Sequence, residues 1–207
     1  MGKCVIFCAG EFLGLAEPVG QEDLVIAADG GYRYATALGI TPHIVLGDFD
    51  SLGFVPENGQ VFPVEKDDTD AMLAVRRGLE RGYKEFVLYG TLDGPRLDHT
   101  IANLQTLQFL ADRGASGFLV GCDQIATVVC NGCLELPATY KGTVSVFCMG
   151  ADAHGVTIEG LKYTLQNGVL SAGFPLGVSN AFVGKSGKIS VDAGSLLVIY
   201  PRENGIK

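Results

Sequence analysis

The strongest constraint on the fold is a change of sequence pattern near residue 122. Before it, short and continuously apolar runs alternate with amphipathic stretches. The apolar runs predict strands at 4–8, 24–28, 43–46, 61–63, 85–89 and 117–121. The stretches between them predict helices over 31–38, 70–81 and 98–113, the last two ended by glycines. Apolar strands separated by helices predict an α/β part whose parallel sheet is covered on both faces.

After residue 124 the pattern contains only short strands. The segments "IATVVCNGCLEL", "GTVSVFCM", "GVTIEGLKYTL" and "KISVDAGSLLVIYP" are separated by turn residues, and none has a helical period. This pattern predicts a small all-β sandwich or barrel. We therefore expect an α/β domain at 1–123 and a β-sandwich domain at 124–207, packed together because no long linker separates them.

Charge and hydropathy exclude two classes of partner. The net charge of -8 argues against a nucleic-acid surface, because binding to phosphates needs a basic stripe. No segment approaches the roughly 20 apolar residues of a membrane span. The first apolar run is short and is followed by Glu11, so it predicts a first strand rather than a signal peptide. These features predict a cytoplasmic protein that binds neither nucleic acid nor membrane.

Two short motifs imitate functional sites. Cys130 and Cys133 form a C-x-x-C motif, but its interior is Asn-Gly, so it predicts a β-hairpin in preference to a zinc or redox site. The segment "FVGKSGK" at 182–188 resembles the end of a P-loop. Ser179 stands where the first glycine should be, and a strand follows instead of a helix. We interpret this segment as a turn.

The stretch "VLGDFDSLG" at 45–53 carries two carboxylates immediately after an apolar strand. Side chains alternate along an extended chain, so Asp48 and Asp50 are expected to point the same way. Two like charges so close together repel each other unless a cation lies between them. The pair therefore predicts a bound cation.

Three further polar clusters follow predicted strands. They are "AADGG" with Asp29, "KDDTD" with Lys66, Asp67, Thr69 and Asp70, and "GPRLDHTIAN" with Arg96, Asp98, His99 and Asn103. Each alone is compatible with a turn or a helix cap. In a parallel sheet, however, all of them gather at the edge where ligands bind. Clustered carboxylates suit Mg²⁺, and Lys66 and Arg96 suit phosphate, so the set predicts a phosphate-transfer site.

These motifs, in this order and spacing, resemble the thiamine pyrophosphokinase family. The segments "IEGLKYTL", "PLGVSNAF" and "ISVDAGSLLVIY" are similar to that family's thiamine-binding β-sandwich domain. The resemblance implies transfer of a pyrophosphoryl group from ATP to thiamine, with Mg²⁺, giving thiamine diphosphate and AMP. It also implies a homodimer, with thiamine held between the α/β part of one subunit and the sandwich of the other.

Residue roles follow from the same resemblance. It implies Mg²⁺-binding and catalytic acids at Asp48, Asp50, Asp70 and Asp98. It implies ATP or phosphate contacts at Asp29, Ser51, Asp67, Thr69, Arg96 and Asn103, with Lys66 beside them. It implies thiamine contacts at Ser179 and Asn180, although Ala181 stands where the family usually has Glu. Two alternatives remain open: a different acceptor such as a pterin alcohol, or a non-catalytic sensor of thiamine or nucleotide.

Overall fold

The computed structural model describes residues 2–50, 52–57, 59–61 and 68–203. The chain divides into two compact units. The first contains the chain up to Thr106 together with Gly117–Cys122, and the second contains Leu107–Ser116 together with Asp123–Glu203. Residues 107–116 precede the domain boundary expected from the sequence, yet they cluster with the second unit.

The first unit is an α/β structure. Its elements are β1 (Cys4–Phe7), β2 (Leu24–Ala28), α1 (Gly31–Ala37), β3 (Ile44–Gly47), β4 (Gly59–Val61), α2 (Asp70–Glu80), β5 (Glu85–Tyr89), α3 (Leu97–Ala111), which runs on into the second unit, and β6 (Ser116–Val120). The strand order is β6-β5-β1-β2-β3-β4. The pairs β1–β2, β1–β5, β2–β3 and β3–β4 are all parallel. These elements agree with the predicted ones to within about two residues at each end, apart from 62–63, which lie outside the described residues.

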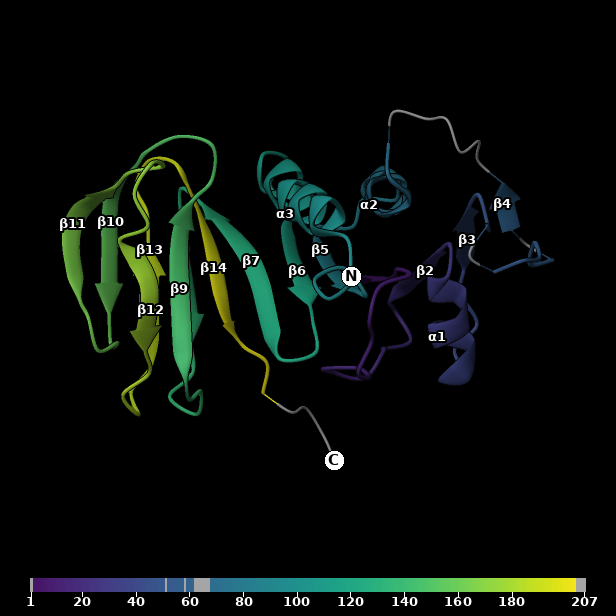
Figure 1. The fold of residues 1–207 in the computed structure, drawn as a ribbon, viewed down its shortest axis with the longest axis horizontal. Helices are drawn as coiled ribbons and strands as arrows, with labels where there is room; N and C mark the ends of the chain where they lie inside the picture. The colour runs from purple at the N-terminus through teal and green to yellow at the C-terminus, as the bar shows by residue number, and fades with distance from the viewer. Residues whose placement is uncertain (1, 51, 58, 62–67, 204–207) are drawn as a thin grey trace. The chain divides into compact units, whose positions relative to one another are not determined.

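Burial on both faces explains the continuous apolar character of these strands. Every residue of β1, β2 and β3 is buried. The helices α1 and α2 both pack against β1 and β2, and Figure 1 shows them on opposite sides of these strands. A parallel sheet of this kind has no face left for water, so its strands do not alternate between apolar and polar residues.

A close approach of backbone to backbone places α1 on the sheet. An added Cβ at Gly31, the first residue of α1, would lie 2.0 Å from the carbonyl oxygen of Phe7 in β1. Only glycine fits at such a distance. The second glycine of the "AADGG" motif is therefore needed for packing as well as for a turn.

The second unit contains only strands after its first helical residues. They are β7 (Gln124–Cys130), β8 (Cys133–Leu136), β9 (Thr143–Cys148), β10 (Ala153–Glu159), β11 (Leu165–Leu170), β12 (Gly177–Ala181), β13 (Gly187–Ser190) and β14 (Ser195–Pro201). They form two antiparallel groups, β12-β9-β14-β7 and β11-β10-β13-β8. Val146 and Leu196 from the first group and Ile158 and Ile189 from the second belong to one buried core. The two groups thus share a core, as the layers of a sandwich do.

The predicted hairpin at Cys130–Cys133 is wrong. The strands β7 and β8 do flank Asn131 and Gly132, but β7 pairs with β14 whereas β8 pairs with β13 in the other sheet. Asn131 has a positive φ of 46°, and its Oδ1 accepts a hydrogen bond of 2.9 Å from the Gly194 N–H. Asn-Gly here turns a corner between sheets. Both cysteines are free thiols, and the turn expected at 182–188 is present between β12 and β13.

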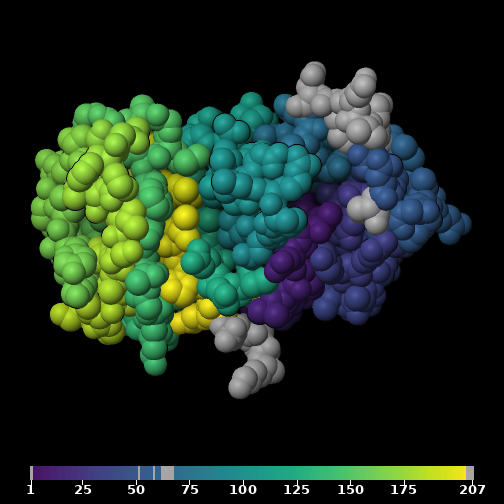
Figure 2. Space-filling model, in the orientation of Figure 1, coloured from purple at the N-terminus to yellow at the C-terminus, as the bar shows by residue number. Residues whose placement is uncertain are grey.

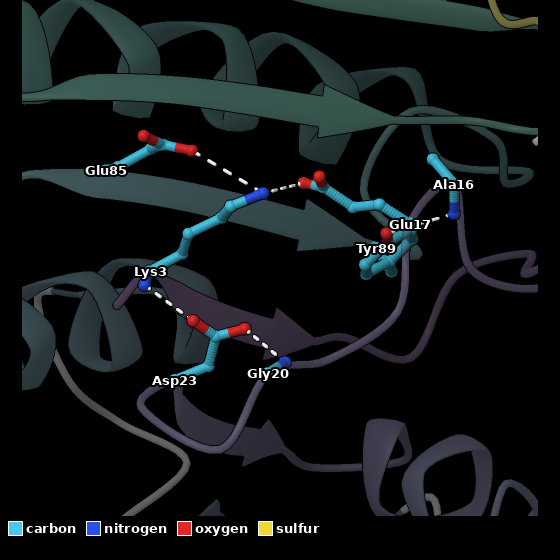
Figure 3. A network of polar contacts seen from close by, with 7 residues as sticks. All are labelled: Lys3, Ala16, Glu17, Gly20, Asp23, Glu85 and Tyr89. Atoms are coloured by element: carbon cyan, nitrogen blue, oxygen red, sulfur yellow. Dashed lines mark hydrogen bonds and ion pairs between the residues drawn. The ribbon is translucent and has the colours of Figure 1, made fainter. Parts of the chain in front are cut away.

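The loop between β1 and β2 is fastened at several points of the first unit. Figure 3 shows Lys3 between Glu17 and Glu85, with Ala16 N–H donating to the Tyr89 hydroxyl at 3.1 Å. Part of this N-terminal segment lies at the surface, coloured purple in Figure 2 and bordered by the blue atoms of residues that follow it in the chain. Among the helices described, none is both long and apolar enough to cross a membrane.

Candidate active site

The carboxyl ends of the parallel strands meet at one edge of the first unit. Phe7 at the end of β1 is in register with Ala27 and Tyr89, and Ala28 is in register with Leu46. A cavity of about 570 Å³ lies at this edge, lined by residues that follow β1, β2, β3 and β5 and by the starts of α2 and α3. This is where an open parallel sheet binds its ligands.

The structure brings many of the predicted site residues together. The predicted residues that line the cavity are Asp29, Asp48, Thr69, Asp70, Arg96 and Asn103. Asp50 and Asp98 are near in sequence but do not line it. Ser179 and Asn180 belong to the second unit. Ser51, Lys66 and Asp67 lie outside the described residues.

Asp29 lines this cavity, and one of its carboxylate oxygens is buried. It follows β2 in a left-handed conformation with φ of 47°, and its N–H donates to the Leu46 carbonyl at 2.8 Å. Its Oδ1 is buried and has no hydrogen-bond partner among the described residues. A buried carboxylate oxygen without a partner is costly unless a donor or a cation reaches it. Asp29 is therefore suited to contact a ligand.

The extended conformation expected beyond Gly47 is wrong. Gly47 has a φ of 147° and Phe49 a φ of 61°, so the chain turns and side chains no longer alternate. Phe49 is buried in a small core with Ala27, while Asp50 is exposed. The Asp48 Oδ1 accepts a 3.2 Å hydrogen bond from the Asp50 N–H. The turn places the Phe49 side chain in the core, and of the two acids only Asp48 lines the cavity.

The start of α2 combines a helix cap with cavity contacts. Thr69 is the N-cap residue, and its Oγ1 accepts a hydrogen bond of 3.2 Å from the Met72 N–H. Asp70 begins the helix beside the cavity, where its charge also favours the helix dipole. Asp68, which lines the cavity as well, is paired with Arg76 at 2.9 Å. Capping and cavity lining thus involve the same segment.

Arg96 and Asp98 are bound to each other. The guanidinium donates to both carboxylate oxygens, at 3.3 Å from Nε and 2.5 Å from Nη2. This hydrogen bond holds the pKa of Asp98 below its usual value, and Asp98 raises the pKa of Arg96. Both side chains are exposed, at 63% and 65%.

Asn103, which lies in α3, holds the loop between β5 and α3 in place. It is 9% exposed, and its Nδ2 donates to the Thr91 carbonyl at 2.8 Å. Thr100 adds a hydrogen bond of 3.3 Å from its Oγ1 to the Leu92 carbonyl. The sequence reasoning did not select Asp93, which lies in this loop and lines the cavity. The available signal was its position in the loop between the predicted strand at 85–89 and the predicted helix at 98–113.

In the second unit, the side chain of Asn180 also makes its hydrogen bonds to backbone groups. It is 5% exposed, its Oδ1 accepts from the Tyr163 and Ala181 N–H groups at 2.9 Å each, and its Nδ2 donates to the Tyr163 carbonyl at 2.6 Å. Ser179 is exposed and has a φ of 60°. Asn180 therefore fixes the chain at Tyr163, whose side chain is 59% exposed.

The fold and cavity define a protein whose α/β unit carries an acid-lined cavity and whose second unit is built mainly of antiparallel strands. Two family models match this chain, "Thiamin pyrophosphokinase, catalytic domain" over residues 16–117 and "Thiamin pyrophosphokinase, vitamin B1 binding domain" over residues 133–196. The chain belongs to the thiamine pyrophosphokinase family.

Individual relatives agree with the family models. Thiamine pyrophosphokinase of Bacillus subtilis is 27% identical over 86% of this chain and 87% of its own length. The crystal structure of thiamine pyrophosphokinase from Bacillus subtilis superposes with a TM-score of 0.87 at 25% identity, covering 97% of this chain and 99% of that one. The crystal structure of thiamin pyrophosphokinase from Geobacillus thermodenitrificans gives a TM-score of 0.80 at 27% identity, with 99% of both chains covered.

Proposed function

We propose that this chain transfers the pyrophosphoryl group of ATP to the hydroxyl of thiamine, giving thiamine diphosphate and AMP. The observation that carries the proposal is the acid-lined cavity at the carboxyl edge of the parallel strands, in a chain that matches both domain models of the family. A cavity of about 570 Å³ is within the range of nucleotide-sized ligand sites.

The cavity suits Mg²⁺ held jointly with phosphate. In the described part of the chain, no three His, Cys, Asp or Glu side chains are grouped closely enough to hold a metal ion by themselves. Mg²⁺ is commonly bound by one or two carboxylates plus substrate phosphates, so such a group is not required. The buried and unpartnered Oδ1 of Asp29 supports a cation or donor in the cavity. We propose ligands from among Asp48, Asp50, Asp70 and Asp98. When bound, Mg²⁺ would neutralise phosphate charge.

The protein's own residues would position the nucleotide. Arg96 would contact the triphosphate through its planar guanidinium, together with Thr69 at the start of α2. Asn103 would act by holding the loop that carries Arg96, as its hydrogen bond to Thr91 indicates. Asp29 would contact the nucleotide side of the cavity. Roles for Ser51, Lys66 and Asp67 rest on the family resemblance alone.

The reaction would be an in-line displacement at the β-phosphorus. The thiamine oxygen attacks, the bond from the β-phosphorus to the AMP oxygen breaks, and the hydroxyl proton passes to a carboxylate such as Asp70 or Asp98. Transfers of this kind depend mainly on positioning and charge neutralisation. Asp98 is ion-paired with Arg96 in the structure, so it would have to exchange partners before accepting the proton.

The second unit would supply the thiamine contacts, in a homodimer. Asn180 holds the backbone of Tyr163, and the chain contains no tryptophan, so the exposed tyrosine ring is a candidate for stacking on thiamine. Ser179, which precedes Asn180 in the sequence, is also exposed. We propose that these residues meet thiamine together with the α/β unit of a second copy.

Product analysis tests the proposal. Incubating the protein with ATP, Mg²⁺ and thiamine should yield AMP and thiamine diphosphate in equal amounts, and chelating Mg²⁺ should stop the reaction. Formation of ADP and thiamine monophosphate would overturn the pyrophosphoryl mechanism. AMP release with a pterin alcohol but not with thiamine would replace the acceptor.

A further inference from the structure

Asp93 joins three loops at the edge of the cavity. Its backbone carbonyl accepts a hydrogen bond of 2.9 Å from the Glu11 N–H, in the loop after β1. Its side-chain Oδ2 accepts a hydrogen bond of 2.6 Å from the Cys122 N–H, after β6. Asp93 itself lies in the loop after β5, and all of these residues belong to the first unit. One half-buried residue thus connects the loops that follow three strands.

The loops joined by Asp93 are packed backbone against backbone. The Gly10 N–H donates to the Gly90 carbonyl at 3.0 Å. An added Cβ at Gly10 would lie 2.6 Å from the Gly90 oxygen and 2.8 Å from the Asp93 oxygen. An added Cβ at Gly90, whose φ is 69°, would lie 2.5 Å from the Cys8 oxygen. All four residues line the cavity, so a shift of the loop at Asp93 moves a wall of the cavity.

The side chain of Asp93 links the loop to the chain after β6, which the hydrogen bonds from Asn103 and Thr100 do not do. Asn103 and Thr100 hold the loop from α3 through the carbonyls of Thr91 and Leu92. The link to Cys122 runs through the Asp93 carboxylate. A carboxylate that accepts a short N–H bond makes one of the stronger hydrogen bonds in proteins. Removing it would release the middle of the loop that carries Arg96.

We propose that Asp93 is a positioning residue for the nucleotide. It holds the loop 90–96 against the chain after β6, so that Arg96 and the cavity wall at Gly10 and Gly90 are placed to contact the triphosphate. This inference rests on the proposed function. It assigns Asp93 no role as a metal ligand or proton acceptor, although its charge borders the cavity. What the role requires is an acceptor oxygen at this place, and not a negative charge.

Two substitutions separate these roles. Asp93→Asn keeps a side-chain oxygen that accepts the Cys122 N–H and removes the charge, whereas Asp93→Ala removes both. We expect Asp93→Ala to lower kcat/KM for ATP by about 10- to 100-fold. We expect Asp93→Asn to stay within about fivefold of the unchanged protein, because only the charge-assisted part of the bond is lost. KM for thiamine should change much less in both variants.

Asp23 provides a matched control. Its carboxylate also accepts two backbone N–H groups, from Lys3 at 2.8 Å and from Gly20 at 2.7 Å (Figure 3). It precedes β2, at the opposite ends of the strands from the cavity, and does not line the cavity. Asp23→Ala should therefore lower the unfolding midpoint without changing kcat/KM for ATP of the folded protein. This control separates loss of fold from loss of positioning.

Nucleotide binding is measured separately, by titrating ATP with Mg²⁺ in the absence of thiamine. A Kd for ATP raised at least about tenfold by Asp93→Ala, with recovery in Asp93→Asn, supports the proposal. An equal loss of ATP affinity in both variants would mean that Asp93 acts through its charge. An unchanged Kd for ATP in Asp93→Ala would mean that the hydrogen bond to Cys122 is dispensable. Either result overturns the proposal. If Asp93→Ala does not fold, a Kd for ATP raised at least about tenfold in Asp93→Asn still overturns the proposal. Failure of the proposed function would appear differently, as ATP binding by the unchanged protein without AMP formation from thiamine.

Discussion

Arg96 and Asp98 neutralise each other at the start of α3, through a two-point ion pair between residues two positions apart. One of them is the expected phosphate contact and the other an expected catalytic acid. A triphosphate in the cavity would compete for the Arg96 guanidinium, since phosphate oxygens accept the same paired N–H groups as a carboxylate. ATP binding would in this way release Asp98 from its partner.

The first prediction concerns this guanidinium. Arg96→Ala should lower kcat by about 100- to 1,000-fold, as expected for loss of a donor to charge that develops in the reaction. Arg96→Lys should recover only part of it, because an ammonium cannot make the two-point contact. The unfolding midpoint should hardly change, because both partners are exposed. Steady-state kinetics with a thermal unfolding control test this. If both kcat and KM for ATP were unchanged in Arg96→Ala, Arg96 would have no role in phosphate binding.

The second prediction separates Asp48 from Asp50. Asp48 lines the cavity, whereas Asp50 is exposed beyond the turn at Phe49. Asp48→Asn should therefore reduce turnover by about 100-fold or more and raise the Mg²⁺ concentration needed for activity, and Asp50→Asn should reduce it much less. Rates measured over a range of Mg²⁺ concentrations test this order. A larger effect of Asp50→Asn than of Asp48→Asn would contradict the assignment of Asp48 as the acid that acts in the cavity.

The contrast between these two acids shows what the sequence could predict. The strand that ends at Gly47 and the cavity beyond it follow from local apolar pattern and from the geometry of parallel sheets. The turn after this strand does not follow from either of these. Phe49 leaves the extended path because its ring is buried with Ala27, which belongs to another strand and is distant along the chain. A period-two rule cannot anticipate a turn that tertiary packing selects.

The same limit applies to the connections between loops and sheets. Asn131-Gly132 has the local features of a hairpin turn, but which strands pair is settled by β13 and β14 far along the sequence. Asp93 was missed because its partner, the Cys122 N–H, is 29 positions away. In contrast, Thr69 and Asp70, which the sequence places at the start of a helix, do line the cavity, since a helix start is a local signal.

The third prediction tests the close approach of α1 to the sheet. Alanine favours helices over glycine by about 1 kcal/mol, so Gly31→Ala would stabilise a free helix. Here the added methyl would meet the Phe7 carbonyl at 2.0 Å, and we expect a loss of about 3 kcal/mol in the free energy of unfolding. Gly173→Ala is the control, because nothing lies within 4 Å of its Cβ position and its φ is not positive. Denaturant unfolding of both variants measures the difference, and equal stabilities would refute the steric explanation.

The fourth prediction concerns the thiols of β1 and its end. Burial raises the pKa of Cys4 and of Cys8 to about 12, whereas Cys133 is exposed. Because thiolates are the reactive form, alkylation at about pH 8 should modify Cys133 first and reach Cys4 and Cys8 only on unfolding. The raised pKa values also make the free energy of unfolding depend on pH, because these thiols hold their protons more tightly in the folded state. Their contribution to stability is complete below the usual pKa of 9.0 and is lost as the pH rises toward about 12. Mass spectrometry of labelled peptides checks the order of modification, and early labelling of Cys4 would contradict it.

The last prediction concerns Asn180, whose amide holds both the N–H and the carbonyl of Tyr163. Asn180→Ala leaves these two backbone groups without their partner, and we expect a loss of about 1–3 kcal/mol in the free energy of unfolding. If Tyr163 contacts thiamine, KM for thiamine should also rise, with KM for ATP unchanged, because the nucleotide cavity lies in the other unit. Asn131→Ala is the matched control, since Asn131 likewise holds a backbone group, the Gly194 N–H, at a corner between the sheets. It should lose stability without any change in KM for thiamine. Equal thiamine KM values in the two variants, both measured on folded protein, would restrict Asn180 to a structural role and would remove Tyr163 from the thiamine site.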